Sequence, residues 1–477
     1  MTPPSSAKPL EAALAQNPHL TSLPHPKASV VAPEDLTDTT GTAELLRLPE
    51  VQNLITGDFL VLPCDLVCEL PGESLLDAWM VQNDPLGSVV PPTTESRQGL
   101  PGKPRSCGVG VWFETKGSDA VKDAETDFII TASGKRSIAT PAKNSLRPHL
   151  SKLLYASTTD TLRDKMQEKS GLLLRGGMIR RHGRLTMRTT HRASHVYIFP
   201  RWMLDVIKNN EKFDSISEDI IGWWAKAGWQ EGLADKLEML PPSDVIYKHH
   251  HTHSGRSSVE NFSHLITTRS MSTDTSNDVK RSSFPPPILA YTHPYPSPYM
   301  IRRVDTSALL LSTSLHLAKL PPSRDAVMGS SPTALSHPTK ISTDPSLIAN
   351  HTTIDTSTTL IGPNTSVATH CTVKTSCIGA NCTINEGAKI LDSLLMDGVR
   401  IEAKAALRNC ILGRRCIIGR GATLDGCEIQ EGFVVEDGTI GTKGQKFSVF
   451  EGLENGLENL GEMGENSTDL TNNGITA

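Results

Sequence analysis

Asp65 is the side chain in this sequence that is best placed to do chemistry. It follows a short apolar run at residues 58–63 and is therefore expected at the end of a strand. A carboxylate in that place could hold Mg²⁺ for the transfer of a phosphoryl or nucleotidyl group, which depends mainly on positioning and on neutralising charge. The competing interpretation is a turn residue that ends the strand and takes no part in chemistry.

Histidine and cysteine suggest two further kinds of site. His351 and His370 could act as bases in acyl transfer, although a single surface histidine is usually inert, and residues 249–253 read HHHTH and could bind a metal ion adventitiously. The chain has nine cysteines and no CxxC pair, which suits a reducing compartment and argues against a zinc ribbon or a disulfide framework. Several of the cysteines share a sequence slot with alanine and threonine, so we predict that they are buried packing residues and not metal ligands.

Residues 175–192 form a basic segment that contains no acidic residue. Its arginines include Arg180, Arg181, Arg184 and Arg188, and such a stripe could bind phosphate or an acidic partner. The alternative is a solvated strand edge whose positive charges discourage aggregation, and this is the interpretation that we prefer.

The elements that would position these residues are clearest near the C-terminus. Single aliphatic residues recur there at spacings of 6, 6 and 5, which add up to a 17-residue unit that repeats from Ile361 to Ile429. This period fits short strands that each send one aliphatic residue into a three-sided parallel coil. A small residue four positions after an aliphatic one is expected at a coil corner, as at Thr365, Cys371, Cys377, Cys382, Ala388, Ala405, Cys416 and Ala422.

The first half of the chain reads as an α/β domain, because strands alternate with helices and all six tryptophans lie before residue 230. One helix is predicted at residues 74–82, with a buried face made of Leu75, Leu76 and Trp79. A second helix is predicted to begin at a capping box formed by Ser215 and Glu218. Its inward residues are expected to be Ile220, Ile221 and Trp224.

Composition limits the classes of function. With 47 Lys plus Arg against 52 Asp plus Glu, the formal net charge is -5, so no overall positive field would draw the protein to nucleic acid or to an anionic membrane. The N-terminus has no apolar signal-peptide core, and the apolar stretch 308–320 is interrupted by polar residues. We expect a soluble, cytosolic protein with no membrane partner and no direct nucleic-acid contact.

Three stretches of the chain carry a resemblance to a known family. Residues 57–67 (GDFLVLPCDLV), 194–199 (SHVYIF) and 301–306 (IRRVDT) resemble the gamma subunits of eukaryotic translation initiation factor 2B in their fungal version. The likeness spans residues 18–444. An α/β domain followed by hexapeptide coils is also similar to the sugar-nucleotide pyrophosphorylases, which belong to the same superfamily.

The resemblance implies a pyrophosphorylase-like (Rossmann-type nucleotidyltransferase) α/β domain followed by a left-handed parallel β-helix. It also implies a non-catalytic subunit of the guanine-nucleotide exchange factor that recharges initiation factor 2 with GTP. The implied partners are the other factor 2B subunits, especially epsilon, and initiation factor 2 itself. The epsilon subunit adds an acidic, aromatic-rich helical domain after its coils, and the residues after Lys446 show no counterpart, which favours the gamma type.

Two departures from the pyrophosphorylase pattern bear on catalysis. No Gly-rich, Arg- and Lys-bearing phosphate loop precedes Asp58, so the α/β domain is expected to be N-terminally incomplete and to expose a sheet edge. In catalytic relatives a glycine precedes the aspartate that matches Asp65, and a second carboxylate lies near residues 192–195. This chain has Cys64 and no carboxylate at those positions.

We therefore expect no catalytic, cofactor-binding or metal-binding residue and no cofactor; the alternatives are a sugar-1-phosphate nucleotidyltransferase and a hexapeptide acyltransferase. The predicted organisation is a Pro-rich segment (1–33), the incomplete α/β domain (34–248), a disordered Ser/Thr/His/Pro-rich insertion (249–287), a segment that closes the α/β domain (288–320), a flexible linker (321–345), the β-helix (346–444) and an acidic Gly/Asn-rich tail (445–477).

Overall fold

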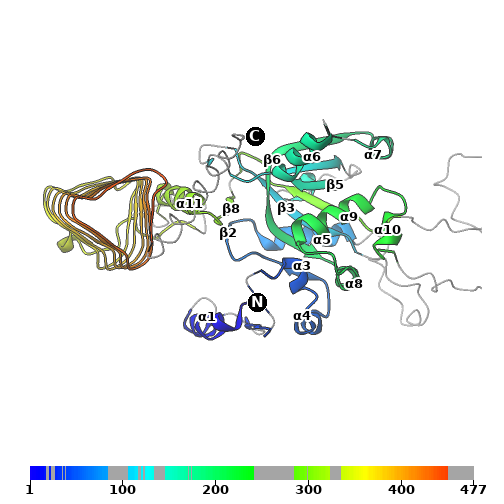
Figure 1. The fold of residues 1–477 in the computed structure, drawn as a ribbon, viewed down its shortest axis with the longest axis horizontal. Helices are drawn as coiled ribbons and strands as arrows, with labels where there is room; N and C mark the ends of the chain where they lie inside the picture. Colours follow the sequence, from blue (N-terminus) through cyan, green and yellow to red (C-terminus); the bar gives the residue numbers. More distant parts are fainter. Residues whose placement is uncertain are drawn as a thin grey trace, which may run out of the picture. The chain divides into compact units, whose positions relative to one another are not determined.

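A computed structural model describes residues 1–17, 21–22, 27–34, 36–37, 39–83, 106–116, 120–121, 124–133, 145–169, 171–172, 174–240, 284–297, 299–322 and 335–448. The HHHTH run and most of the predicted insertion, linker core and acidic tail lie outside these residues. The chain divides into two compact units (Figure 1). Unit 1 consists of Met1–Leu62, Glu73–Trp112 and Glu125–His293, and unit 2 of Pro63–Gly72, Phe113–Ala124 and Pro294–Ala477.

A six-stranded sheet organises unit 1. Its strand order is β1 (Phe59–Val61), β6 (Leu185–Phe199), β3 (Gly108–Glu114), β7 (Ile288–Thr292), β5 (Leu150–Thr158) and β4 (Asp127–Ser133). β3 and β7 are parallel, whereas β1 with β6, β4 with β5 and β5 with β7 are antiparallel. The long strand β6 also pairs with β4 through its first half, so the sheet closes on itself. β1, at the end of the order, has β6 as its partner among the described strands.

Unit 1 also contains helices, some of which pack against this sheet. They are α1 (Pro4–Gln16), α3 (Thr42–Leu45), α4 (Pro49–Leu54), α5 (Gly72–Asn83), α6 (Thr159–Lys169), α7 (Gly176–His182), α8 (Trp202–Asn209), α9 (Ile221–Ala227) and α10 (Leu233–Lys236), with a 3₁₀ turn at Arg147–His149. The segment predicted only as Pro-rich thus begins with a helix, α1, which buries no residue. Among the described residues, no helix is long and apolar enough to cross a bilayer.

The helix predicted at residues 74–82 is α5, but its buried face differs from the prediction. Leu75 and Ala78 are buried, whereas Leu76 is 42% exposed. Adjacent residues on a helix point about 100° apart, so Leu75 and Leu76 cannot both face the core of a short amphipathic helix. Trp79 is half-buried, and its indole N–H donates to the carbonyl of Cys107 at 2.8 Å.

The predicted cap at Ser215 is confirmed, with one change of partner. The Ser215 hydroxyl accepts the N–H of Glu218 at 3.4 Å, but it is Asp219 whose carboxylate accepts the N–H of Ser215, at 3.0 Å. A π-turn at Ile216–Ile220 precedes α9, and its extra residue per turn moves the reciprocal partner one position along. The three predicted inward residues are fully buried, as the exposed fractions of 0% for Ile220, Ile221 and Trp224 show.

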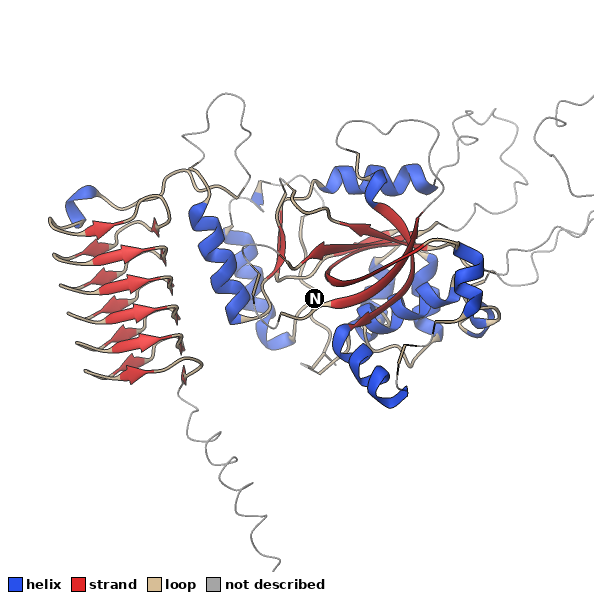
Figure 2. Cartoon of the chain, turned by 90° about the horizontal axis from the view of Figure 1, so that it is seen from above, coloured by secondary structure: helices blue, strands red, loops and turns tan. Residues whose placement is uncertain are grey.

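Unit 2 contains the predicted coils, a parallel β-solenoid of about six turns (Figure 2). One face is β10 (Leu360–Ile361), β13 (Cys377–Ile378), β16 (Leu394–Leu395), β19 (Ile411–Leu412), β22 (Glu428–Ile429) and β25 (Lys446–Phe447). The second is β11 (Ser366–Val367), β14 (Thr383–Ile384), β17 (Arg400–Ile401), β20 (Ile417–Ile418) and β23 (Val434–Val435). The third is β9 (Thr353–Ile354), β12 (Thr372–Lys374), β15 (Lys389–Leu391), β18 (Ala406–Arg408), β21 (Thr423–Asp425) and β24 (Ile440–Gly441).

The inward aliphatic residues of the repeat are buried in every coil, from Ile361 at 1% to Ile429 at 4% exposed. The corner assignment is right for most of the predicted small residues and wrong for Cys377, which is half-buried on β13 and whose thiol donates to the carbonyl of Ser314 at 3.2 Å. One side of the coil is a residue shorter, so its corner residue comes three positions after the aliphatic one. The buried corner residues of that side are Ser376, Ser393, Cys410 and Cys427, whereas in the first coil the buried Thr359 comes five positions after Ile354.

Three further elements complete unit 2. β2 (Leu66–Cys68) and β8 (Ile301–Arg303) form an antiparallel ribbon. Helix α11 (Ser307–Lys319), which the Thr306 hydroxyl caps by accepting the N–H of Leu309, packs against β13 and β16 of the coils. A 3₁₀ turn at Pro345–Leu347 precedes the first coil.

Candidate functional site

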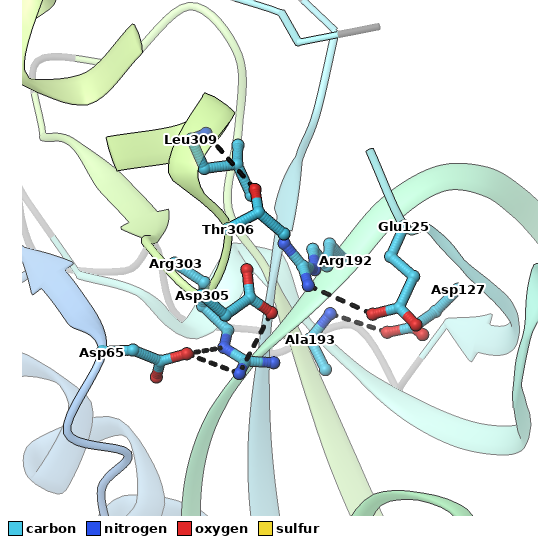
Figure 3. A network of polar contacts seen from close by, with 9 residues as sticks. All are labelled: Asp65, Glu125, Asp127, Arg192, Ala193, Arg303, Asp305, Thr306 and Leu309. Carbon is cyan, nitrogen blue, oxygen red and sulfur yellow. Dashed lines mark hydrogen bonds and ion pairs between the residues drawn. The ribbon is translucent and has the colours of Figure 1, made fainter. Parts of the chain in front are cut away.

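Asp65 lies in the turn before β2 and forms an ion pair across the ribbon with β8. The Arg303 guanidinium donates to the Asp65 Oδ2 twice, from Nε at 3.1 Å and from a terminal nitrogen at 2.6 Å (Figure 3). The same guanidinium lies 3.4 Å from Asp305. The side chains of Asp65 and Arg303 are only 19% and 13% exposed, so the pair is held in a partly desolvated environment.

This geometry gives Asp65 a positioning task. Its backbone carbonyl accepts the N–H of Val304 at 2.9 Å, and its carboxylate neutralises a cation that two strands hold in place. The other carboxylate oxygen, Oδ1, is buried and has no hydrogen-bond partner among the described residues. Within the ribbon, therefore, one oxygen of Asp65 is committed to Arg303.

A second group of polar residues lies on β4 and β6 in unit 1. The Asp127 carboxylate accepts the N–H of Ala193 at 2.6 Å, and Arg192 pairs with Glu125 at 3.1 Å (Figure 3). The Arg192 side chain is 6% exposed and that of Glu125 is 63% exposed. The sequence has no carboxylate at residues 192–195, but the pairing of β4 with β6 brings there Asp127, the first residue of β4, and Glu125, two residues before it.

The carboxyl group of Asp127 has an unusual proton affinity. Withdrawal from water raises its pKa from 3.8 to about 6, against the lowering effects of the Ala193 hydrogen bond and of Arg192, while Glu125 raises it further. A carboxyl with a pKa near 6 exchanges its proton close to neutral pH, which is a property found often at functional sites. Sequence reasoning missed this residue because neither its strand partner nor its burial can be read locally.

A residue in a left-handed backbone conformation lies beside this group. His195 has a φ of 56° in the middle of β6, a left-handed conformation that is uncommon for residues other than glycine. Its ring stacks on Tyr197 with the ring centroids 6.1 Å apart. The hydroxyl of the preceding Ser194 is buried and donates to the carbonyl of Val111 at 3.0 Å, which ties the kink to the neighbouring strand β3.

The basic segment 175–192 is neither one stripe nor a free sheet edge. Arg180 and Arg181 lie on α7, whereas Arg188 lies on β6, which is paired with β4, and donates to the Thr131 hydroxyl at 3.0 Å. Arg181 donates to the carbonyl of Trp229 at 3.1 Å and also contacts Glu231. The prediction of a solvated strand edge is therefore corrected for this part of the chain.

The two histidines proposed as bases lie at corners of neighbouring coils. His351 and His370 have φ values of 65° and 60°, and their rings stack with centroids 5.7 Å apart. One coil further on, the corresponding corner is Gly387, with a φ of 71°, so the two rings mark a left-handed corner. Among the described residues, no group of three or more His, Cys, Asp or Glu is arranged to hold a metal ion.

Among known proteins, one family of domains matches the coils of this chain. A family model described as the EIF2B subunit epsilon LbH domain matches residues 339–441. With the observed parallel solenoid, this match defines the C-terminal part as a left-handed β-helix of hexapeptide repeats, as predicted. The class of protein is thus a hexapeptide-repeat protein with an α/β region before its coils.

The particular resemblance comes from a curated relative. The translation initiation factor eIF2B subunit gamma of Schizosaccharomyces pombe is 25% identical over 209 residues, which cover 44% of this chain and 37% of the relative. The matched part is therefore well under half of the relative's length. The chain is eIF2B gamma-like, which confirms the resemblance seen in the sequence.

One of the solved structures that are similar to this chain is an acyltransferase. A mutant of perosamine N-acetyltransferase from Caulobacter crescentus, in complex with CoA and GDP-perosamine, is 22% identical and covers 24% of this chain and 54% of that one. The TM-score is 0.19, which carries no argument about fold or function.

Proposed function

We propose that this chain acts in the cytosol as a non-catalytic subunit of the translation initiation factor 2B complex, where it helps to exchange GDP for GTP on initiation factor 2. The observation that carries the proposal is the likeness to the fission-yeast gamma subunit. The family-model match over residues 339–441 supports it, since it ties the coils to another subunit of the same complex.

The surface of the β-helix suits a subunit contact. From Ile361 to Ile429 each short strand sends one aliphatic residue inward, and its neighbour faces out. On the last coils some outward residues are aliphatic too: Ile417 is 36%, Val434 57% and Ile440 77% exposed. Ile417 and Val434 are direct partners on β20 and β23, so they lie side by side on one face of the coils and offer a small apolar surface for a partner protein to cover.

The polar groups support a role without chemistry of its own. The Asp65 Oδ2 is occupied by Arg303, and Asp127 and Glu125 are engaged with the Ala193 N–H and with Arg192. These contacts position strands, because each joins two segments that are distant in sequence. A subunit that presents surfaces to partners requires this kind of internal order.

The proposal is tested by affinity purification of the tagged chain from its own cells, followed by mass spectrometry. We expect the other factor 2B subunits, epsilon above all, and initiation factor 2 to be recovered. Ile384→Asp places a charge in the coil core and should abolish recovery, whereas Thr383→Asp, on the same strand but facing out, should fold and keep it. Recovery of the chain alone as a homo-oligomer would contradict the proposal and direct attention to sugar-nucleotide synthesis and acyl transfer.

The non-catalytic role has a separate test in the assembled complex. Asp65→Asn keeps the shape of the side chain and removes its charge, and it should leave the rate of GDP release from initiation factor 2 unchanged. A complex that is intact but inactive with this variant would show that Asp65 takes part in the reaction.

A further inference from the structure

A cavity in unit 1 remains unexplained by the proposed role. It has a volume of about 420 Å³, within the range of ligand-binding pockets, and lies among α6, α7, α9 and the strands β4 and β5. Among the described residues that line it, none is acidic and four are cationic: Lys165, Lys169, Arg175 and Lys226. The acidic residues Asp164 and Glu168 of α6 are not among the residues that line it.

The floor and the rim of the cavity are apolar. The floor includes Met178 and Trp229, which are 2% and 8% exposed, and the indole N–H of Trp229 is already bonded to the carbonyl of Leu154 at 2.8 Å. At the rim, large apolar side chains are left in water: Met166 is 43%, Leu174 39% and Trp223 38% exposed. A cluster of exposed apolar side chains around a hollow indicates a surface that binds a partner.

The positive charges stand close to this apolar surface. The Lys226 ammonium lies 4.5 Å from the ring centroid of Trp223 and 5.4 Å from that of Tyr155. Burial lowers the pKa of Lys226, and Lys165 lowers it further. An anion that approached the rim would therefore meet several like charges that repel one another, and it would relieve that repulsion.

We propose that this cavity binds an acidic peptide segment of a partner protein, with one large apolar side chain of the segment inserted over Trp229. Lys165, Lys169 and Arg175 are exposed, so their long side chains can follow several carboxylates spaced along a peptide. A phosphorylated small molecule would be better served by buried donors fixed around a single phosphate. The inference does not depend on the exchange-factor role.

The test measures binding of a short fluorescein-labelled peptide, with one central leucine between pairs of glutamates, to the full-length protein by fluorescence anisotropy. Lys165→Glu/Lys169→Glu replaces attraction by repulsion and should weaken binding by about tenfold or more. Trp223→Ala removes rim surface and should also weaken it by about tenfold. The matched control Lys208→Glu/Lys212→Glu reverses two exposed charges outside the cavity and should leave the affinity unchanged.

Two further peptides separate the apolar anchor from the charge. Replacing the leucine by serine, or all glutamates by glutamines, should each abolish measurable binding. The proposal is overturned if the original peptide does not bind the wild-type protein, if the serine peptide binds equally well, or if the control variant loses as much affinity as the cavity variant. A nucleotide that binds where no peptide does would likewise overturn it in favour of a small-molecule site. Circular dichroism verifies that each variant is folded.

Discussion

Replacing Asp127 by asparagine should change how the stability of unit 1 depends on pH. The carboxyl has a pKa of about 6 in the folded protein, against an ordinary value of 3.8. The difference of about 2.2 units corresponds to about 3 kcal/mol at most, at ~1.4 kcal/mol per unit. Because the Asp127 side chain is half-buried and partly screened by water, we expect the free energy of unfolding to change by about 2 kcal/mol as this carboxyl titrates.

The sign follows from proton binding. Between pH 4 and pH 6 the folded protein holds the Asp127 proton more tightly than the unfolded chain does, so the stabilisation is complete below about pH 4 and is lost as the pH rises through about 6. Asparagine does not titrate, and its side-chain oxygen can still accept the Ala193 N–H. Relative to the wild type, Asp127→Asn should therefore gain about 2 kcal/mol of stability between pH 4 and pH 7.5.

The assay is urea unfolding followed by tryptophan fluorescence, since all six tryptophans lie in unit 1. The quantity to compare is the difference in the free energy of unfolding between variant and wild type. Burial and Arg188 lower the pKa of His191 to about 4, so in both proteins this histidine contributes a pH dependence of the opposite sign. Asp127→Ala also cannot titrate, but it offers the Ala193 N–H no acceptor. The free energy of unfolding of Asp127→Ala should vary with pH as that of Asp127→Asn does and should be about 1–2 kcal/mol lower at every pH.

A difference between wild type and Asp127→Asn that is flat from pH 4 to pH 7.5 would refute this reasoning. So would a variant that becomes less stable than the wild type as the pH rises, because the carboxylate would then be favoured in the folded protein. Different slopes for the asparagine and alanine variants would show that a group other than residue 127 titrates differently in the two variants, which would contradict the assignment of the pH dependence to the Asp127 carboxyl.

Two other substitutions test the coils and the ribbon. Ile418→Ala should destabilise the coils by about 2–4 kcal/mol, because Ile418 is 0% exposed. Ile417, on the same strand, is 36% exposed, and Ile417→Ala should cost under about 1 kcal/mol. Hydrogen exchange of the coil peptides measures both losses of stability, and equal losses would contradict the inward-outward alternation. Asp65→Ala removes the Arg303 partner at 2.6 Å, while Asp305 stays 3.4 Å from the guanidinium, and should cost about 1–2 kcal/mol. Faster hydrogen exchange at Leu66–Cys68 and Ile301–Arg303 would report it, and unchanged exchange would count against the ion pair as a clamp.

The coils could be predicted because their sequence rule is local. Between Ile361 and Ile429 each strand buries one aliphatic residue, and each coil repeats the one before it, so a 17-residue period fixes register and burial together. The error at Cys377 arises at the one side where the period is uneven. There the corner falls to Ser376, whose hydroxyl accepts the N–H of Ser393 at 3.3 Å, and Ser393 in turn accepts the N–H of Cys410 at 3.1 Å. A spacing of five between inward aliphatic residues indicates a shorter side of the coil, but it does not identify the residue that occupies the corner.

The polar groups of unit 1 could not be predicted in the same way. The sequence has no carboxylate at residues 192–195, yet Asp127 lies beside them in space because β4 pairs with β6. That pairing joins segments some sixty residues apart, and no local pattern encodes it. A carboxylate expected from a family's motif can thus be supplied from another strand, so its absence at one sequence position does not show that the protein lacks the group. Here the group that is present bonds a backbone N–H and has a pKa of about 6, and its titration is the property by which its role can be measured.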